Sequence, residues 1–431
     1  MPRLPGRPLT FLLTGFTWLL FASLVGLAIL VGLVRGTPLP NWIRHAHVHA
    51  ALVGGVAQMI LGALLIFISP LLLTGRTQRE SHPLLFLTIN GSALGMVAGF
   101  GFGSYPVIGI SGGFVIASFL WIARDTWLQA RTSLNAPPMN LWFYALAILA
   151  LFAGLACGET MAFAWAQQSF GYIRLAHIHL NILGFITLAI IGTMHNLLPT
   201  VLNAPLYSPR LARIVFLLFP LGLAVLIGGF LNSSVMIEMG GGGLLVCGAL
   251  LYAFNLFRTW TASARQGNAA SDHFLVGTLF LVITLVCGVL VAANNVSALP
   301  VMPFGSLHLM AYTHMALIGF ILQTIIGALS HLVPVTLATY RLSSPKKRPP
   351  YLAHLTDVLN RWRTVQVGSL SLGTMGLAVL ASLTWNVPLS SIYIQSSMWA
   401  AFGLLLAGVT IFTVKLVAVL WTDPEQPASQ P

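Results

Sequence analysis

The segment His45-Ala-His47-Val-His49-Ala-Ala-Leu-Val-Gly54 opens an apolar run that continues through Gly62 to Pro70. The same pattern occurs twice more along the chain. One copy, His177-Ile-His179-Leu-Asn-Ile-Leu-Gly184, runs through Gly192 and His195 to Pro199, and the other, Tyr312-Thr-His314-Met-Ala-Leu-Ile-Gly319, runs through Gly327 and His331 to Pro334. Counted from the second residue of each pair, glycine falls at +5 and +13 in all three copies and proline at +20 or +21. This self-similarity predicts an internal repeat.

The composition places these segments in a membrane. The chain has 431 residues, of which 57% are hydrophobic and 6% charged, and its mean hydropathy is +0.89. Soluble domains carry about 25% charged residues, so the composition excludes a soluble enzyme, a disordered protein and a coiled coil. We therefore expect a multi-pass membrane protein whose first partner is the lipid bilayer.

A helix needs about 20 apolar residues to cross a bilayer, and the sequence contains twelve such stretches. They lie at roughly 9–34, 48–73, 83–104, 106–123, 140–166, 176–200, 211–232, 235–257, 273–297, 306–335, 365–386 and 392–420. The first stretch is too long for a signal-peptide core and is expected to be retained as a span. Three copies of a four-helix unit make twelve helices. We expect an all-α, single transmembrane domain over 1–431 with pseudo-threefold repeats at about 1–124, 125–258 and 259–431.

The formal charge of +12 is explained by topology. With the N-terminus inside, 17 of the 20 Lys and Arg residues fall in cytoplasmic segments, leaving Arg35, Arg44 and Arg174 outside. This alternation follows the positive-inside rule, so no nucleic-acid partner is expected. It predicts a protein of the inner (plasma) membrane with both termini in the cytoplasm.

The same topology gathers seven histidines in one layer near the periplasmic side. They are His45, His47, His49, His177, His179, His308 and His314. Polar side chains inside a span are costly and usually mark a site, and neutral imidazole is a common ligand of haem iron, copper and zinc. We therefore predict metal ligands at His49, His314, His177 and His179, with His47 as a further cofactor-binding residue.

Helix geometry restricts how each pair acts. Residues i and i+2 point about 200° apart, so His47 and His49 face different neighbours and cannot share one metal in a regular helix. The glycines at +5 and +13 suit either close helix contact or a planar macrocycle. Arg44 and Arg174 immediately precede two His-rich segments, where they suit pairing with haem propionates or simple snorkelling to the interface.

At this point the chain resembles the catalytic subunit I of the haem–copper oxidase superfamily, in particular its nitric oxide reductase and cbb-type branch. The tenth span, Ala311-Tyr-Thr-His314 to Gly327-Ala-Leu-Ser-His331-Leu-Val-Pro334, is similar to that family's A-H-F-H…GG…H-W-F-P segment. The resemblance implies that His314 and His49 are the axial ligands of a low-spin haem b. It also implies copper or a second haem, which we place near His177 and His179, and respiratory electron transfer with reduction of oxygen or nitric oxide. The donor would be a c-type cytochrome or a quinol, with an accessory subunit as a further partner.

Two departures keep a second interpretation open. Tyr312 stands where the family has its high-spin haem ligand, and the seventh span, 211–232, contains no histidine for a copper site. The run His45-Ala-His47-Val-His49…Gly62-Ala-Leu-Leu…Pro70…Thr74-Gly75-Arg76 also looks like a segment of NnrS-type proteins, which are haem and copper membrane proteins linked to nitric oxide stress. This second resemblance implies a non-catalytic role in nitric oxide tolerance or cofactor handling. No catalytic residue is therefore assigned.

The remaining polar residues carry weaker expectations. His195 and His331 are predicted near the inner face, as ligands of a second haem or without a ligand role. His82, His273 and His354 are expected to be solvated, and Glu159 and Glu238 to be the only carboxylates within the spans. A secondary transporter would also build twelve spans from repeats, but it gives no reason for the histidine layer.

Overall fold

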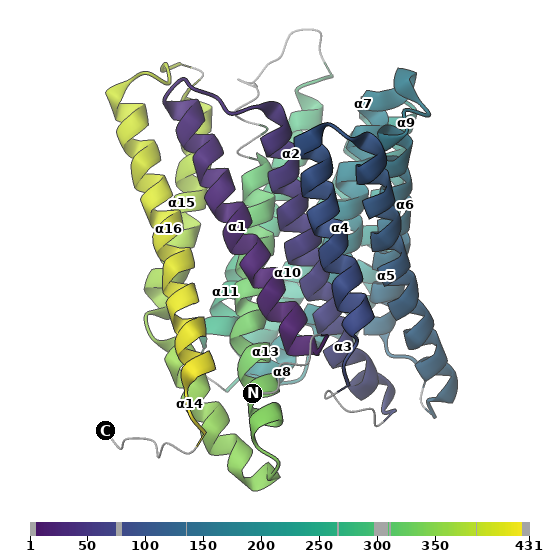
Figure 1. The fold of residues 1–431 in the computed structure, drawn as a ribbon, viewed down its shortest axis with the longest axis vertical. Coiled ribbons are helices and arrows are strands. Elements are labelled where there is room, and N and C mark those ends of the chain that lie inside the picture. The colour runs from purple at the N-terminus through teal and green to yellow at the C-terminus, as the bar shows by residue number, and fades with distance from the viewer. Residues whose placement is uncertain are drawn as a thin grey trace. The chain divides into compact units, whose positions relative to one another are not determined.

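A computed structural model describes residues 6–74, 80–134, 136–264, 267–296, 309, 312–384 and 386–424. Over these ranges the chain is helical and contains no strand, and twelve helices are long and apolar enough to cross a membrane (Figure 1). They span Pro8–Val34, Asn41–Leu72, Pro83–Phe102, Tyr105–Thr132, Met139–Ala162, Gln167–Leu202, Pro209–Leu231, Val235–Ala262, Ala269–Ala293, Tyr312–Arg341, Arg363–Leu383 and Ile392–Trp421. The predicted all-α class and the count of twelve spans are confirmed.

Two helices extend beyond the expected spans and thereby include an aspartate each. The fourth span continues to Thr132 and the ninth begins at Ala269, because a helix propagates through polar residues once its apolar part is packed. Asp125 and Asp272 therefore lie within spanning helices. Both aspartates lie beyond the apolar stretches of these helices, so the expectation that Glu159 and Glu238 are the only carboxylates within the apolar spans stays a prediction.

The first of two compact units comprises residues 1–193 and 227–234. Its elements are α1 (Pro8–Val34), α2 (Asn41–His49), η1 (Ala50–Ala57), α3 (Gln58–Leu72), α4 (Pro83–Phe102), α5 (Tyr105–Thr132), α6 (Met139–Ala162), η2 (Gln167–Ser169), α7 (Phe170–His179), η3 (Leu180–Thr187) and the start of α8 (Leu188–Leu202). Within this unit α1 packs on η1 and α3, α4 packs on α5, and α6 packs on α7 and η3.

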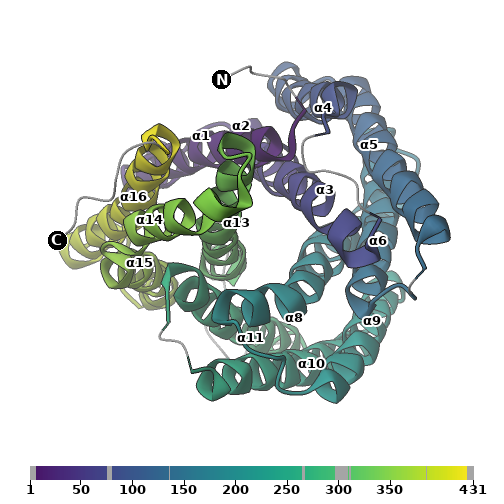
Figure 2. The same cartoon turned by 90° about the horizontal axis from the view of Figure 1, so that it is seen from below.

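The second unit comprises residues 194–226 and 235–431. It holds the rest of α8 and most of α9 (Pro209–Leu231), followed by α10 (Val235–Ala262), α11 (Ala269–Ala293), η4 (Met315–Leu322), α13 (Gln323–Arg341), η5 (Pro345–Lys347), α14 (Arg348–Asn360), α15 (Arg363–Leu383) and α16 (Ile392–Trp421). Here α11 packs on α10, α13 and η4, while α15 packs on α16. The short helix α14 lies against α13 and α16 (Figure 2).

The three repeated segments share one local form. In each, α-helix ends at the second residue of the pair, a π-helix of eight residues follows, and α-helix then resumes. The π-helices begin immediately after His49, His179 and His314. Wide helical turns of this kind are uncommon and often occur at functional sites. The division of the whole chain into three repeats remains a prediction.

The repeated glycines at +13 make close helix contact. A Cβ atom on any of them would lie within 2.8 Å of a phenylalanine side chain on the long helix that precedes the segment. The pairs are Gly62 with Phe11, Gly192 with Phe143 and Gly327 with Phe274. The absence of a side chain therefore lets a phenylalanine side chain approach the backbone, which favours close helix contact as the role of the glycines at +13.

Candidate cofactor site

The first residue of each pair lies against a glycine of a preceding long helix. The ring of His47 lies 2.8 Å from the position of a Cβ on Gly26 of α1, and that of His177 lies 3.1 Å from a Cβ on Gly158 of α6. The hydroxyl of Tyr312 lies 3.1 Å from the same position on Gly288 of α11. The repeat therefore extends to side-chain packing, with Tyr312 in the place of a histidine.

The second residue of each described pair has different neighbours. The ring centre of His49 lies 4.7 Å from that of Phe100 on α4, and the ring centre of His179 lies 4.7 Å from that of Phe230 on α9. The expected divergence of the two histidines within each pair is thus confirmed in the first unit. His314 lies in the second unit, half-buried, directly before η4. His308 lies outside the described residues.

Hydrogen bonds to backbone carbonyl oxygens orient three of these imidazoles. Nδ1 of His49 lies 2.8 Å from the His45 oxygen, Nδ1 of His179 lies 2.8 Å from the Leu175 oxygen, and Nδ1 of His177 lies 2.8 Å from the Gly154 oxygen. A carbonyl oxygen only accepts, so Nδ1 carries the proton in each ring. Nε2 then keeps its lone pair, which is the arrangement of a metal-ligating histidine.

Asn181 reinforces the position of His177. Its side-chain nitrogen donates to the His177 backbone oxygen at 2.7 Å, and it packs on Gly154, where an added Cβ would lie 2.6 Å from that nitrogen. Gly154 and Gly158 thus form a smooth strip on α6 that receives Asn181 and His177. The sequence prediction missed this strip, although its spacing of four residues on one helix face was visible.

One pair from different segments comes together. The ring centres of His49 and His177 lie 6.4 Å apart with an angle of 25° between their planes. In the described part of the chain no group of three or more His, Cys, Asp or Glu side chains could hold a metal ion. Among the described residues, the first unit therefore brings two histidines together without a third metal-binding side chain beside them.

Arg44 and Arg174 both lie within electrostatic range of His45. Both side chains are exposed, and both act electrostatically on His45, whose ring centre is 5.6 Å from that of Phe100. Phe100 also contacts His49. Two cations from different segments therefore act on His45, one helical turn before His49, and guanidinium groups pair well with anionic groups.

Glu159 lies apart from the histidine nitrogens. Its carboxylate oxygens lie 2.9 Å and 2.2 Å from the positions of Cβ atoms on Gly109 and Gly112 of α5. The carboxylate therefore packs against bare backbone between α5 and α6. Glu238 lies in the first turn of α10.

The other histidines divide by environment. His195 is 7% exposed, and its ring meets that of Tyr252 edge-on at 5.5 Å. His331, His354 and His82 are half-buried, and the ring of His82 lies 4.9 Å from that of Trp121. His273 is fully buried, so the expectation that it is solvated is wrong.

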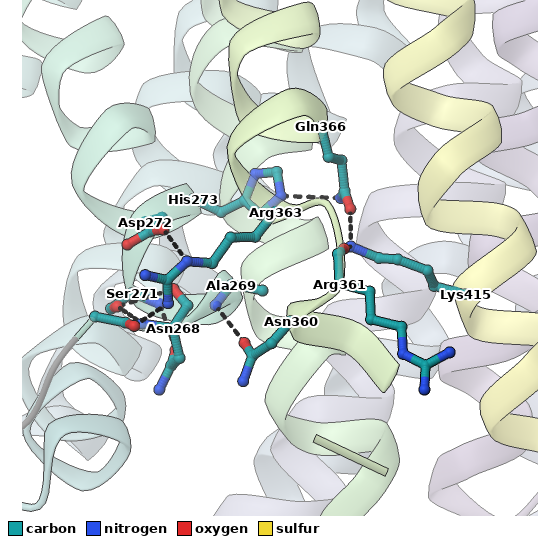
Figure 3. A network of polar contacts seen from close by, with 11 residues as sticks. Asn268, Ala269, Ser271, Asp272, His273, Asn360, Arg361, Arg363, Gln366 and Lys415 are labelled. Atoms are coloured by element: carbon teal, nitrogen blue, oxygen red, sulfur yellow. Dashed lines mark hydrogen bonds and ion pairs between the residues drawn. The ribbon is translucent and has the colours of Figure 1, made fainter. Parts of the chain in front are cut away.

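His273 belongs to a second polar cluster, which lies in the second unit (Figure 3). Its Nδ1 donates to Gln323 Oε1, and its Nε2 accepts a 3.0 Å hydrogen bond from Gln366 Nε2. Gln366 Oε1 accepts from Lys415, whose ammonium group also donates to the Arg361 carbonyl oxygen at 2.8 Å. This chain of bonds unites α11, α13, α15 and α16.

The base of this cluster holds the start of α11. Asn268 and Ser271 form a capping box, and Asn360 accepts a 2.9 Å hydrogen bond from the Ala269 backbone nitrogen. Arg363 pairs with Asp272 at 3.3 Å and donates to the Gly267 carbonyl oxygen. The partners from α14 and α15 meet α11 because the chain turns sharply at Trp362, whose φ is 51°.

Comparison with known proteins places this fold. No family model matches the chain, and no curated protein matches it. Among solved structures, the chain matches one described as "Cryo-EM structure of a heme-copper terminal oxidase dimer provides insights into its catalytic mechanism". The TM-score is 0.70 at 13% sequence identity, and the match covers 98% of this chain and 86% of that chain. The chain therefore has a fold found in a haem–copper terminal oxidase.

Proposed function

We propose that the chain is a haem-binding integral membrane protein that transfers electrons in a respiratory chain and reduces a small diatomic molecule, oxygen or nitric oxide. The observation that carries this proposal is the pair of nearly parallel imidazoles of His49 and His177, whose ring centres lie 6.4 Å apart and whose Nδ1 atoms each bond to a carbonyl oxygen. Two Nε2 lone pairs in an apolar setting suit haem iron, which binds imidazole nitrogen. The shared fold supports the same class of protein.

The ligand roles follow the residues of the histidine layer. His49 is proposed as an axial ligand of haem b, and the resemblance assigns His314 as the ligand on its other side. His177 and His179 are then available to copper or a second haem. His47 is proposed as a further cofactor-binding residue. Arg44 and Arg174 are proposed to pair with haem propionates. The haem itself would supply the one-electron chemistry.

The setting of the protein is proposed from its charge distribution. The bias of Lys and Arg supports a topology with both termini in the cytoplasm and the histidine layer toward the periplasm of an inner membrane. A c-type cytochrome or a quinol is the proposed electron donor, with an accessory subunit as partner.

Optical spectroscopy of the purified chain tests haem binding. We expect a pyridine haemochrome spectrum of haem b and a loss of low-spin absorbance in His49→Ala. The matched control is His354→Ala, which replaces a half-buried histidine on α14 and leaves the spectrum unchanged. Absence of haem, or unchanged low-spin spectra in both His49→Ala and His314→Ala, contradicts the proposal.

A specific observation favours a second, non-catalytic function. Tyr312 packs on Gly288 where the corresponding histidines pack on glycines, and the described residues hold no group of three metal-binding side chains. These features suit a haem or copper protein of the NnrS type, acting in nitric oxide stress or cofactor handling. Consumption of oxygen or nitric oxide with a reduced donor separates the two: metal-dependent turnover refutes the non-catalytic function, and a haem-loaded protein without turnover refutes catalysis.

A further inference from the structure

We infer that His49 and His177 bind opposite sides of one haem iron, and that Arg44 and Arg174 pair with the carboxylates of that haem. This inference rests on the proposed function, because it names the second ligand of the haem that His49 binds. It pairs the second span with the sixth, in place of the His49 and His314 pair that the resemblance implies.

The tautomers leave one ligand atom on each ring. Nδ1 of His49 is committed to the His45 oxygen and Nδ1 of His177 to the Gly154 oxygen, each at 2.8 Å. An unprotonated Nδ1 would set two acceptors against each other at that distance, so the proton stays on Nδ1. Only Nε2 can then bind a metal, and no tautomer change is needed for it to do so.

The separation of the ring centres bears on the coordination geometry that the pair could adopt. With metal–nitrogen bonds of about 2.0 Å, ring centres of two imidazoles lie about 6 Å apart when they bind opposite sides of one metal. The same bonds give about 5 Å at the tetrahedral angle and about 4.5 Å at a right angle. The observed 6.4 Å matches the opposite arrangement. A haem imposes that arrangement, since its four nitrogens occupy the plane between the two axial ligands.

The surroundings favour a haem over a bare metal ion. Arg44 and Arg174 both act on His45, one turn before His49, and two guanidinium groups repel an added cation. They attract a ligand that brings its own carboxylates. Phe100, 4.7 Å from His49 and 5.6 Å from His45 between ring centres, offers an apolar surface to a macrocycle.

His179 provides a matched comparison in the same segment. Its Nδ1 also bonds to a carbonyl oxygen, that of Leu175 at 2.8 Å, but its ring faces Phe230. It therefore has the same tautomer as His177 without the facing imidazole. A change that acts only by disturbing this helix would affect Ile178→Gly as much as His177→Gly, because Ile178 lies between the two histidines with an exposed side chain.

Spectroscopy of the axial ligands tests the inference in the purified, haem-loaded protein. Electron paramagnetic resonance and near-infrared magnetic circular dichroism of wild type are expected to show low-spin iron with two imidazoles. In His177→Gly that signal is lost, the iron becomes high-spin, and added imidazole restores the low-spin form. In His177→Met, whose side chain fills the space, one imidazole signature is replaced by that of a thioether, with a raised reduction potential. Ile178→Gly, which changes an exposed side chain of the same helix, keeps the wild-type signature.

Each contrary outcome has a distinct meaning. If the bis-imidazole signal persists in His177→Gly and disappears in His314→Gly, the inference is overturned and haem binding at His49 stands. A wild-type protein that contains no haem, or copper alone by metal analysis, overturns both the inference and the proposed function. Failure of imidazole to restore the low-spin form in a folded, haem-containing His177→Gly also overturns the inference, because a ligand role predicts rescue.

Discussion

The side-chain amide of Gln366 links Lys415 to the imidazole of His273. Its oxygen accepts from the ammonium group, and its nitrogen donates to Nε2 of His273 at 3.0 Å. Gln366 and His273 are fully buried and Lys415 is 4% exposed. Since the amide has one accepting and one donating end, this order fixes His273 as the tautomer protonated on Nδ1, and Nδ1 donates to Gln323.

Replacing Gln366 should destabilise the polar cluster that joins α11, α13, α15 and α16. Gln366→Leu leaves a buried ammonium group with one fewer acceptor and the His273 Nε2 without its donor. A buried polar group left unsatisfied costs about 1–3 kcal/mol, and more when it is charged. We expect a loss of roughly 3 kcal/mol or more in the free energy of unfolding, measured in mixed micelles with increasing denaturing detergent.

Gln58→Leu is the control for this prediction. Gln58 is also fully buried, but its nitrogen makes only a 3.5 Å contact with the Phe11 oxygen and its own side-chain oxygen has no hydrogen-bond partner. Leucine removes that unsatisfied oxygen, so this variant should be as stable as wild type or more stable. Equal losses in the two variants would show that the bonds of Gln366 contribute nothing particular.

The ion pair between Asp272 and Arg363 should contribute little by comparison. Its side chains are 29% and 34% exposed, so water and salt screen their attraction. We expect Asp272→Asn to lower the free energy of unfolding by about 0.2–1 kcal/mol, with the difference shrinking as salt is added. A loss that is large and independent of salt would contradict this view of the pair.

Adding a methyl group at Gly158 should disturb the proposed haem ligand. The new Cβ would lie 3.1 Å from the His177 ring, so the ring must shift and its bond to the Gly154 oxygen must lengthen. Loss of such a supporting bond typically lowers metal affinity by roughly tenfold or more. We expect Gly158→Ala to retain less haem on titration with a competing haem acceptor.

Gly171→Ala is the matched control on α7. A Cβ at Gly171 meets no atom within 4 Å, so the substitution adds only helix propensity, about 0.5–1 kcal/mol in favour of the helix. Haem retention should equal that of wild type. A loss in both variants would point to a general sensitivity of this region.

The glycines of the repeat should be intolerant of alanine for a reason that is common to all three segments. At Gly327 the new Cβ would lie 2.7 Å from the Phe274 ring and 3.0 Å from the Ala270 oxygen. Overpacking of this kind costs about 1–3 kcal/mol. Gly327→Ala should therefore unfold at lower detergent fraction than Gly243→Ala, whose Cβ meets nothing within 4 Å.

The spans could be predicted because each depends on its own sequence. Twenty apolar residues suffice to cross a bilayer, so all twelve helices were found, and the positions of His47 and His49 already predicted that they face different neighbours. The helix ends were harder to predict, since Asp272 in the first turn of α11 interacts with Arg363 far along the chain. The π-helices after His49, His179 and His314 have no sequence signature that hydropathy reveals.

The buried cluster around His273 could not be predicted for a different reason. Gln323 is separated from that histidine by 50 residues and Gln366 by 93. Only the packing of the helices brings the two glutamines beside it. A histidine four residues into a helix is as compatible with solvent as with a core. The approach of the His49 and His177 rings could not be predicted either, because it depends on the packing of two segments that are far apart in the sequence.

The hydrogen bonds that orient the imidazoles also set an order of assembly. His49 and His179 bond to oxygens four residues earlier in their own helices, so these rings are oriented as soon as each helix has formed. His177 bonds to an oxygen 23 residues earlier, in α6, so its ring is oriented only after α6 and α7 have docked. A partly synthesised chain therefore presents one oriented imidazole, and the second follows when its helices come together. If His177 is a haem ligand as proposed, its ring would be ready to bind the iron only after α6 and α7 have docked.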